Sequence, residues 1–214
     1  MKREEIISKT LDQMFPHAKV ELNYGNTFEL LVAVVLSAQT TDISVNRVTP
    51  KLFSTYPTPK DLKDAPVESI ENIIRSIGLY RNKAKNIKEL ARVIDETYEG
   101  VVPNKRELLE SLPGVGRKTT NVVLSNAFQI PAFAVDTHVA RISVRLGLAK
   151  KNDSVLEIEK KLMRKFPKTE WLRLHHQMIF FGRYHCLAKN PKCYQCPLYD
   201  LCISEDKLKD IKAE

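Results

Sequence analysis

The stretch LPGVGRKT, residues 112–119, decides how the chain is organised. Its glycines, basic pair and threonine suggest a nucleotide-binding loop, but that motif needs a lysine directly after its second glycine. Here Arg117 separates Gly116 from Lys118. A dinucleotide-binding fingerprint also fails, because Thr119 stands where a third glycine is needed. The glycines therefore belong to another kind of turn.

The residues before this turn favour a helix, whereas both nucleotide-binding motifs require a strand there. Leu108, Leu109 and Leu112 are spaced i, i+1, i+4, which places them on one helical face. Pro113 ends this helix, because proline disfavours a helical residue before it, and the next helix is predicted over about 115–128. Glycines between two helices leave backbone N–H groups uncovered at a positive helix end. The sequence therefore predicts an anion site, which suits the backbone of a polymer as well as a free nucleotide.

The charge balance favours an anionic partner. The chain has 214 residues with 34 Lys and Arg against 26 Asp and Glu, which gives a formal net charge of +8 and a pI near 9.3. Nucleic acid is the commonest partner of such a protein, although a merely basic protein fits the charge as well. With 43% hydrophobic residues, the composition is that of an ordinary globular chain.

Neither a membrane span nor an export signal is evident. No segment approaches the ~18 consecutive apolar residues of a transmembrane helix. The N-terminal stretch MKREEIISKTLDQMF is charged and amphipathic, without the apolar centre of a signal peptide. We therefore expect a soluble, cytoplasmic protein with no membrane partner.

Apolar periodicity predicts helices along nearly the whole chain, separated by Pro, Gly and capping residues. The predicted segments are 3–15, 27–38, 42–54, 67–76, 81–97, 105–111, 115–128, 137–147, 154–166 and 170–185. The stretch FELLVAVVL at 28–36 is rich in β-branched residues and would also suit a buried strand. No partner strand is evident, so we expect a helix that is buried on most sides. The predicted fold class is all-α.

The cysteines form a compact group near the C-terminus. They follow the spacing C-x6-C-x2-C-x5-C, as Cys186, Cys193, Cys196 and Cys202. Disulfides are not expected in a chain without an export signal, so the four thiols indicate a metal or cluster site. The spacing alone leaves zinc and a 4Fe–4S cluster open. Two interpretations of the basic loop between the first two cysteines are compatible. The metal site holds the C-terminal tail in place, and the loop could in addition present positive charge to a phosphate backbone.

Lys118 and Asp136 are the candidate chemical groups. Lys118 lies in the first turn of a predicted helix, where a cation opposes the helix dipole. Its neutral amine is a nucleophile for a sugar or carbonyl carbon, although a simple phosphate contact is the alternative. Asp136 suits a helix N-cap, or a carboxylate that stabilises positive charge developing on a ribose. Nearby His138 fits packing or hydrogen bonding better than catalysis.

Together, LPGVGRKT, VDTH at 135–138 and the cysteine spacing resemble the endonuclease III family of helix–hairpin–helix, iron–sulfur DNA glycosylases. The likeness covers essentially the whole chain and includes LSAQTTD (36–42), SIGLYRNKA (76–84) and FFGRYHC (180–186). It implies two helical domains with a DNA groove between them. The implied domains are a six-helix domain over 20–130, with the hairpin at about 105–128, and an iron–sulfur domain of 1–19 with 131–214.

The resemblance also implies roles for single residues. Lys118 would be the nucleophile and Asp136 its carboxylate partner. Gln39 would fill the gap left by a flipped-out base, and Leu79 would wedge into the duplex. The remaining DNA contacts would come from the hairpin and the cluster loop, namely from Leu112, Gly114, Gly116, Arg117, Thr119 and Lys189. A monovalent cation would assist phosphate binding at the hairpin, and the four cysteines would hold a 4Fe–4S cluster.

Related glycosylases help to define the expected substrate. In the adenine glycosylase branch the lysine is absent and an acid lies in the helix before the glutamine, whereas this chain has Lys118 and carries Val34 at the acid's place. Mismatch thymine glycosylases also lack the lysine, and the 8-oxoguanine relatives generally lack the cluster. The resemblance therefore implies a bifunctional glycosylase and AP lyase for oxidised pyrimidines.

The implied partner is double-stranded DNA with oxidised pyrimidines or AP sites, bound by a monomer on the bacterial nucleoid. Two alternatives remain open: a non-catalytic DNA-binding module stapled by a metal site, and a related glycosylase with a different base preference. A non-catalytic module would have no reason to keep both Lys118 and Asp136. A zinc-stapled RNA-binding protein has little support, because no aromatic stacking motif is present.

Overall fold

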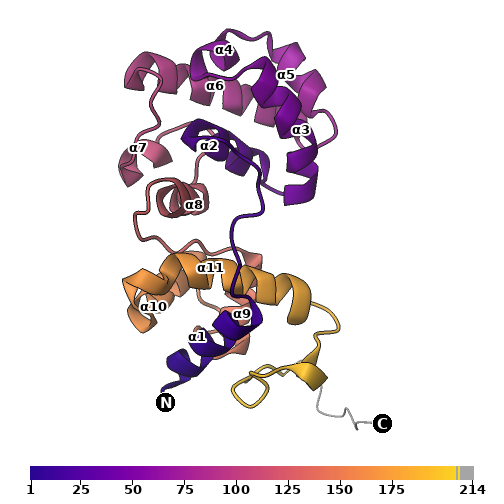
Figure 1. The fold of residues 1–214 in the computed structure, drawn as a ribbon, viewed down its shortest axis with the longest axis vertical. Coiled ribbons are helices and arrows are strands. Elements are labelled where there is room, and N and C mark those ends of the chain that lie inside the picture. Colours follow the sequence, from indigo (N-terminus) through magenta and orange to yellow (C-terminus); the bar gives the residue numbers. More distant parts are fainter. Residues whose placement is uncertain (206, 208–214) are drawn as a thin grey trace. The chain divides into compact units, whose positions relative to one another are not determined.

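The computed structural model describes residues 1–205 and 207, and all regular structure in this part of the chain is helical (Figure 1). The predicted all-α class is therefore confirmed. The chain divides into two compact units, one of residues 21–130 and one of residues 1–20 together with 131–214. Among the described residues, no helix is long and apolar enough to cross a membrane.

Residues 21–130 contain seven α-helices, one more than the six expected. They are α2 (Thr27–Leu36), α3 (Asp42–Thr55), α4 (Pro59–Asp64), α5 (Val67–Ile74), α6 (Tyr80–Tyr98), α7 (Arg106–Glu110) and α8 (Arg117–Ala127). The unexpected helix is α4, which is too short to show an apolar period. It forms because Thr58 and Asp61 make a reciprocal capping box and proline occupies its first position, where a missing N–H is no loss.

The helix α2 is the buried helix predicted for 28–36. All its residues from Leu30 to Leu36 are buried, and it packs against α3, α6 and α8. Asn26 caps it by accepting a hydrogen bond from the Glu29 N–H at 2.9 Å. A helix with neighbours on several sides needs apolar residues around most of its surface. The β-branched residues here therefore reflect burial and do not indicate a strand.

The LPGVGRKT stretch joins α7 to α8, and these two helices pack together. The predicted helix–turn–helix unit is therefore present. Its second helix begins at Arg117, two residues later than predicted, because the glycines before it are not helical. Gly114 has a φ of +76°, in the left-handed region, and Gly116 is extended with φ −100° and ψ 178°.

The second unit combines the N-terminal helix with the helices that follow residue 131. Its α-helices are α1 (Arg3–Met14), α9 (Thr137–Arg145), α10 (Val155–Lys165) and α11 (Trp171–Phe180). α11 packs against α1 and α9, and α9 packs against α10. A core that includes Leu11, Phe133 and Phe181 fills the space between them. This core fixes α9 and the end of α11. Residues 186–202, which contain the four cysteines and are called the cysteine segment below, follow later in the chain.

The segment predicted as one helix over 170–185 is divided. The 3-10 helix η1 (Lys168–Glu170) precedes α11, and the π-helix η2 (Phe181–His185) follows it. Gly182 lies in that π-helix, where an added Cβ would stand only 2.9 Å from the Cβ of His138 on α9. Glycine permits this approach, and a π turn often occurs near a functional site. The first cysteine follows directly after it.

Candidate functional site

The turn between α7 and α8 leaves backbone N–H groups uncovered. The Val115 N–H donates to the Leu112 carbonyl at 3.1 Å and closes the turn. The N–H groups of Gly114 and Gly116 make no hydrogen bond within the described part of the chain. A Cβ at Gly114 would lie 3.3 Å from side chains of α2 and α6, in addition to its positive φ. Uncovered N–H groups at a helix N-terminus form an anion site.

Lys118 is the second residue of α8, and its side chain is exposed. Its amine makes no hydrogen bond or ion pair within residues 1–205 and 207. The first turn of α8 contains no acidic residue, so no carboxylate of that turn occupies this amine. The neighbouring Arg117 guanidinium lies 3.9 Å from the Glu110 carboxylate, and Thr119 is half-buried on the same turn. Lys118 is therefore the accessible amine beside the anion site.

Asp136 is the N-cap of α9, as one of its two predicted roles requires. Its Oδ1 accepts a hydrogen bond from the Val139 N–H at 2.8 Å. Its Oδ2 has no hydrogen bond within the described chain, and the side chain is half-buried. One oxygen thus has a structural partner, while the other remains available for a ligand. Lys118 belongs to the unit of residues 21–130, and Asp136 belongs to the other unit.

Gln39 and Leu79 both lie in tight turns of the same unit. Gln39 follows α2 and has a φ of +53°, and Leu79 directly precedes α6 with a φ of +58°. Both side chains are exposed, and Leu79 has 57% of its surface in contact with solvent. A non-glycine residue with positive φ is uncommon, and such strain is often found at functional sites. The arrangement presents one amide and one apolar side chain outward.

The four cysteines are free of disulfides and half-buried. They lie along the segment that follows η2, and the short 3-10 helix η3 (Cys193–Gln195) forms part of it. Burial, with the three neighbouring thiols, raises the pKa of Cys196 to about 11. These thiols therefore lie near one another, but they need an ion or cluster to become thiolate ligands.

Arg145 of α9 supports the first cysteine ligand. Its guanidinium donates to the Cys186 Sγ at 3.3 Å and to the carbonyls of Leu187 and Ala188 at 2.7 and 3.2 Å. Hydrogen bonds to ligand sulfurs tune iron–sulfur centres. In the described chain, no group of three Cys, His, Asp or Glu side chains could hold a single metal ion. Four cysteine thiols are the ligand set of a 4Fe–4S cluster.

The loop from Leu187 to Lys192 holds the predicted DNA contact Lys189. The Lys192 N–H donates to the His185 carbonyl at 3.1 Å and closes this loop at its base. Asn190 has a φ of +52° at the tip. Lys189 is exposed beside it, so the loop carries an exposed cation between Cys186 and Cys193.

Two family descriptions match the chain. "HhH-GPD superfamily base excision DNA repair protein" matches residues 32–168, and "Iron-sulfur binding domain of endonuclease III" matches residues 186–202. Endonuclease III of Bacillus subtilis (strain 168) is 57% identical over 207 residues, which span 97% of this chain and 94% of that protein. The chain belongs to the endonuclease III family.

Other members of the endonuclease III family agree with this assignment. Endonuclease III of Escherichia coli (strain K12) is 44% identical and spans 97% of both chains. A trapped endonuclease III–DNA covalent intermediate has a TM-score of 0.91 and 55% sequence identity, and the match covers 95% of this chain and 96% of that chain. The predicted enzyme class, a DNA glycosylase with AP lyase activity, and the 4Fe–4S cofactor are therefore confirmed.

Sequence reasoning missed two charged residues near the site of this endonuclease III family member. Arg145, which supports Cys186, gave no signal because its partners are carbonyls and sulfur that lie far away in the sequence. Lys83 is buried with only 4% of its surface exposed. Its signal was readable, since it occupies the same helical face as the buried residues Ile87 and Leu90.

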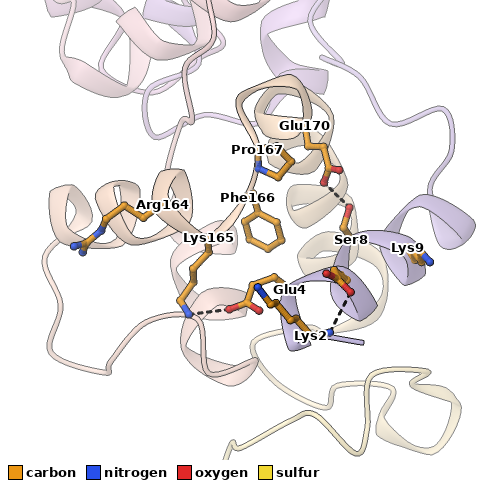
Figure 2. A pocket seen from close by; sticks show the side chains of 10 residues that line it. Lys2, Glu4, Ser8, Lys9, Arg164, Lys165, Phe166, Pro167 and Glu170 are labelled. Carbon is orange, nitrogen blue, oxygen red and sulfur yellow. Dashed lines mark hydrogen bonds and ion pairs between the residues drawn. The ribbon is translucent and has the colours of Figure 1, made fainter.

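Two cavities of the iron–sulfur unit do not contain the predicted catalytic residues. One, of about 510 Å³, lies between α1 and the end of α10 (Figure 2). A Glu4–Lys165 ion pair of 3.0 Å and a Ser8–Glu170 hydrogen bond of 2.7 Å cross its lining. The other, of about 810 Å³, is bordered by α9, the start of α10 and Ala188 of the cluster loop. Neither is lined by Lys118 or Asp136.

Proposed function

We propose that this endonuclease III family protein excises oxidised pyrimidines from double-stranded DNA and then cuts the strand at the resulting AP site. The observation that carries the proposal is the exposed Lys118 amine, which has no partner within the described chain and lies directly after a turn with uncovered N–H groups. The two compact units would act as a hairpin domain and an iron–sulfur domain. The protein would work as a monomer on the bacterial nucleoid.

The damaged base must first leave the duplex, because its sugar carbon cannot be reached inside the stack. Flipping a nucleotide costs a few kcal/mol, and least for a base that pairs and stacks poorly. Gln39 would occupy the space that the base leaves, and Leu79 would wedge between neighbouring bases. Both contacts offset part of the cost by replacing lost stacking. Their exposure and their fixed turns suit this role.

Lys118 then acts in its neutral form. Its nitrogen forms a bond to the anomeric carbon of the sugar, the bond between that carbon and the base breaks, and the base takes up a proton as it leaves. Asp136 would stabilise the positive charge that develops on the sugar through Oδ2, the oxygen that does not take part in the N-cap hydrogen bond. The sugar ring then opens: the C1′–O4′ bond breaks, a proton passes from the lysine nitrogen to O4′, and the nitrogen lone pair forms a C=N bond to C1′. The Schiff base formed in this way acidifies the C2′ hydrogen. Loss of that proton breaks the C3′–O bond, which cuts the strand 3′ to the lesion.

The rest of the site would hold the DNA in place. The N–H groups around Leu112, Gly114 and Gly116 would bind a phosphate, assisted by a monovalent cation on the hairpin carbonyls. Further DNA contacts would come from the side chains of Arg117, Thr119 and Lys189. The 4Fe–4S cluster, held by the four cysteines, would supply structural support for the basic loop that carries the last of these contacts.

Borohydride reduction tests the nucleophile, because it fixes a Schiff base as a stable bond. Purified protein is mixed with borohydride and a duplex that carries one oxidised pyrimidine, and the amount of covalent complex is measured on a denaturing gel. We expect a complex with the native protein and none with Lys118→Gln. Lys9→Gln, at an exposed position of α1, serves as a charge-matched control and should trap normally. An equally strong complex with Lys118→Gln would contradict the assignment.

The substrate class needs a separate experiment. A panel of duplexes, each with one lesion, measures single-turnover excision of oxidised pyrimidines, 8-oxoguanine and mismatched thymine or adenine. We expect the oxidised pyrimidines to be excised fastest. If another class of lesion is excised faster and Lys118 still forms the trapped complex, the proposed chemistry stands and the proposed substrate class is wrong.

A further inference from the structure

Lys83 is a buried cation that the proposed mechanism does not use. It lies on the inner face of α6, one turn after the helix begins, and only 4% of its surface is exposed. A buried charged group destabilises a fold unless it is well paired. Lys83 has no ion pair with a carboxylate in the described chain, and burial alone lowers its pKa. A position of this kind would be filled more favourably by an apolar residue.

The contacts of Lys83 connect two distant turns. Its Nζ donates a hydrogen bond of 2.6 Å to the Thr40 Oγ1, which belongs to the residue directly after Gln39. Its backbone N–H donates at 3.0 Å to the carbonyl of Leu79. One residue therefore joins the turn of Gln39 to the turn of Leu79, although 40 positions separate them in the sequence.

Both turns have a conformation that requires external support. Gln39 and Leu79 have φ values of +53° and +58°, and both are non-glycine residues. Such residues remain in the left-handed region only where surrounding contacts hold them there. The Thr40 N–H donates to the Ser37 carbonyl at 3.1 Å, and the Thr40 hydroxyl donates to the Ala38 carbonyl at 3.4 Å, so the turn has two local contacts at Thr40. The bond from Lys83 adds a contact that ties this turn to α6.

We propose that Lys83 is a positioning residue for base flipping, which holds the Gln39 turn and the Leu79 turn at a fixed separation so that both side chains enter the duplex together. The inference rests on the insertion roles proposed above for Gln39 and Leu79. Lys83 itself takes no part in the bond-breaking steps. Its buried amine is retained because the hydroxyl of Thr40 has to be held, and a lysine can reach it from the inner face of α6.

Four variants separate this role from a structural one. Lys83→Met keeps the length of the side chain without a donor, and Thr40→Val keeps the shape without a hydroxyl. Thr40→Ser restores the hydroxyl. Lys88→Met is the matched control, because Lys88 on the same helix donates to the carbonyls of Lys63 and Ala65 at 2.6 and 2.5 Å, away from both turns.

Three measurements are made on the holoprotein. Stopped-flow fluorescence of 2-aminopurine beside an oxidised pyrimidine reports base flipping. Single-turnover rates are compared for excision of that lesion and for cleavage of a preformed AP site, where no base has to be extruded. Urea denaturation reports stability. We expect Lys83→Met and Thr40→Val to slow flipping and excision by at least about tenfold, since small misplacement strongly reduces rates, and to slow AP-site cleavage far less.

A fifth protein, the double variant Lys83→Met with Thr40→Val, should be no slower than either single variant, because both substitutions remove the same hydrogen bond. Thr40→Ser should recover most of the flipping rate, and Lys88→Met should flip normally. If Lys83→Met flips as fast as native protein, the positioning role is wrong. It is also wrong if all rates fall only in proportion to lost stability. A native protein that fails to excise or trap any lesion would instead overturn the proposed function.

Discussion

At Asp136 a single carboxylate has a structural role and is proposed to have a chemical one. Its Oδ1 holds the first turn of α9 through the Val139 N–H, and its Oδ2 has no hydrogen bond within the described residues. The capping bond fixes the side chain in one orientation, so the second oxygen is presented without further loss of side-chain freedom. The two readings that the sequence left open are therefore compatible with each other.

Substitutions at Asp136 should separate these two roles. Asn is as good an N-cap as Asp, so Asp136→Asn should leave the free energy of unfolding nearly unchanged. Its neutral amide cannot stabilise a positive sugar, so single-turnover excision should fall by about 100-fold or more. Asp136→Ala should lose the same activity and in addition about 1 kcal/mol of stability. Urea denaturation and excision kinetics check both, and native-like excision by Asp136→Asn would leave only the capping role.

The hairpin is the element that determines where the amine and the anion site lie. Its two glycines have different tasks, because Gly114 needs the left-handed region and Gly116 is extended at the N-cap of α8. Gly114 is also enclosed by Asn86 and Val35, whose side-chain atoms would lie 3.3 Å from an added Cβ. Nothing lies near Gly116. The two positions should therefore tolerate substitution differently.

Gly114→Ala should destabilise the hairpin. A non-glycine residue in the left-handed region costs about 1–3 kcal/mol, and the side chains of Asn86 and Val35 would also have to move slightly to make room for the added Cβ. Gly116→Ser is the matched control, since serine is a favoured N-cap and finds open space there. Urea denaturation of both variants measures the difference. Equal stability of Gly114→Ala and the native protein would show that the turn is less constrained than its geometry indicates.

Helices with a clear apolar repeat, and turns marked by glycine, could be predicted from the sequence. Features that depend on tertiary contacts could not. The hairpin and the buried helix α2 follow from spacing and apolar content. The short helix α4 has too few residues for a period and depends on a capping box. The break of the predicted 170–185 helix depends on the packing of Gly182 against His138. For the same reason the partners of Lys83 and Arg145 could not be read from the sequence.

At the scale of the whole molecule, the iron–sulfur unit has two sources of stability. Its helices share a core of fully buried residues such as Leu11, Phe133 and Leu174. The cysteine segment contributes mainly Leu198, which is also fully buried, and half-buried contacts from Cys186 and Cys196. The helical core therefore does not depend on the cluster for most of its buried surface.

Removal of the cluster should loosen the cysteine segment and leave the helices folded. We expect oxidation and chelation of iron to expose 186–205 to proteases and hydrogen exchange, while far-UV circular dichroism changes little. Small metal-dependent domains without a core unfold completely when the metal is lost. A complete loss of helical signal would place this unit in that class and would contradict the independent core.

The net charge of +8 acts on DNA as a long-range field, whereas Lys189 is proposed to contact one phosphate. Lys189→Gln and Lys9→Gln each remove one positive charge from an exposed side chain, so they change the field of the protein equally. Only the first should remove a phosphate contact. The affinity for undamaged duplex, measured at several salt concentrations, separates the two effects, because each contact adds about 0.9 to the slope of log K against log salt. We expect Lys189→Gln to reduce that slope by about one and Lys9→Gln to leave it unchanged. Equal slopes for the two variants would mean that the cluster loop contributes only general charge, and that DNA is held by the hairpin without it.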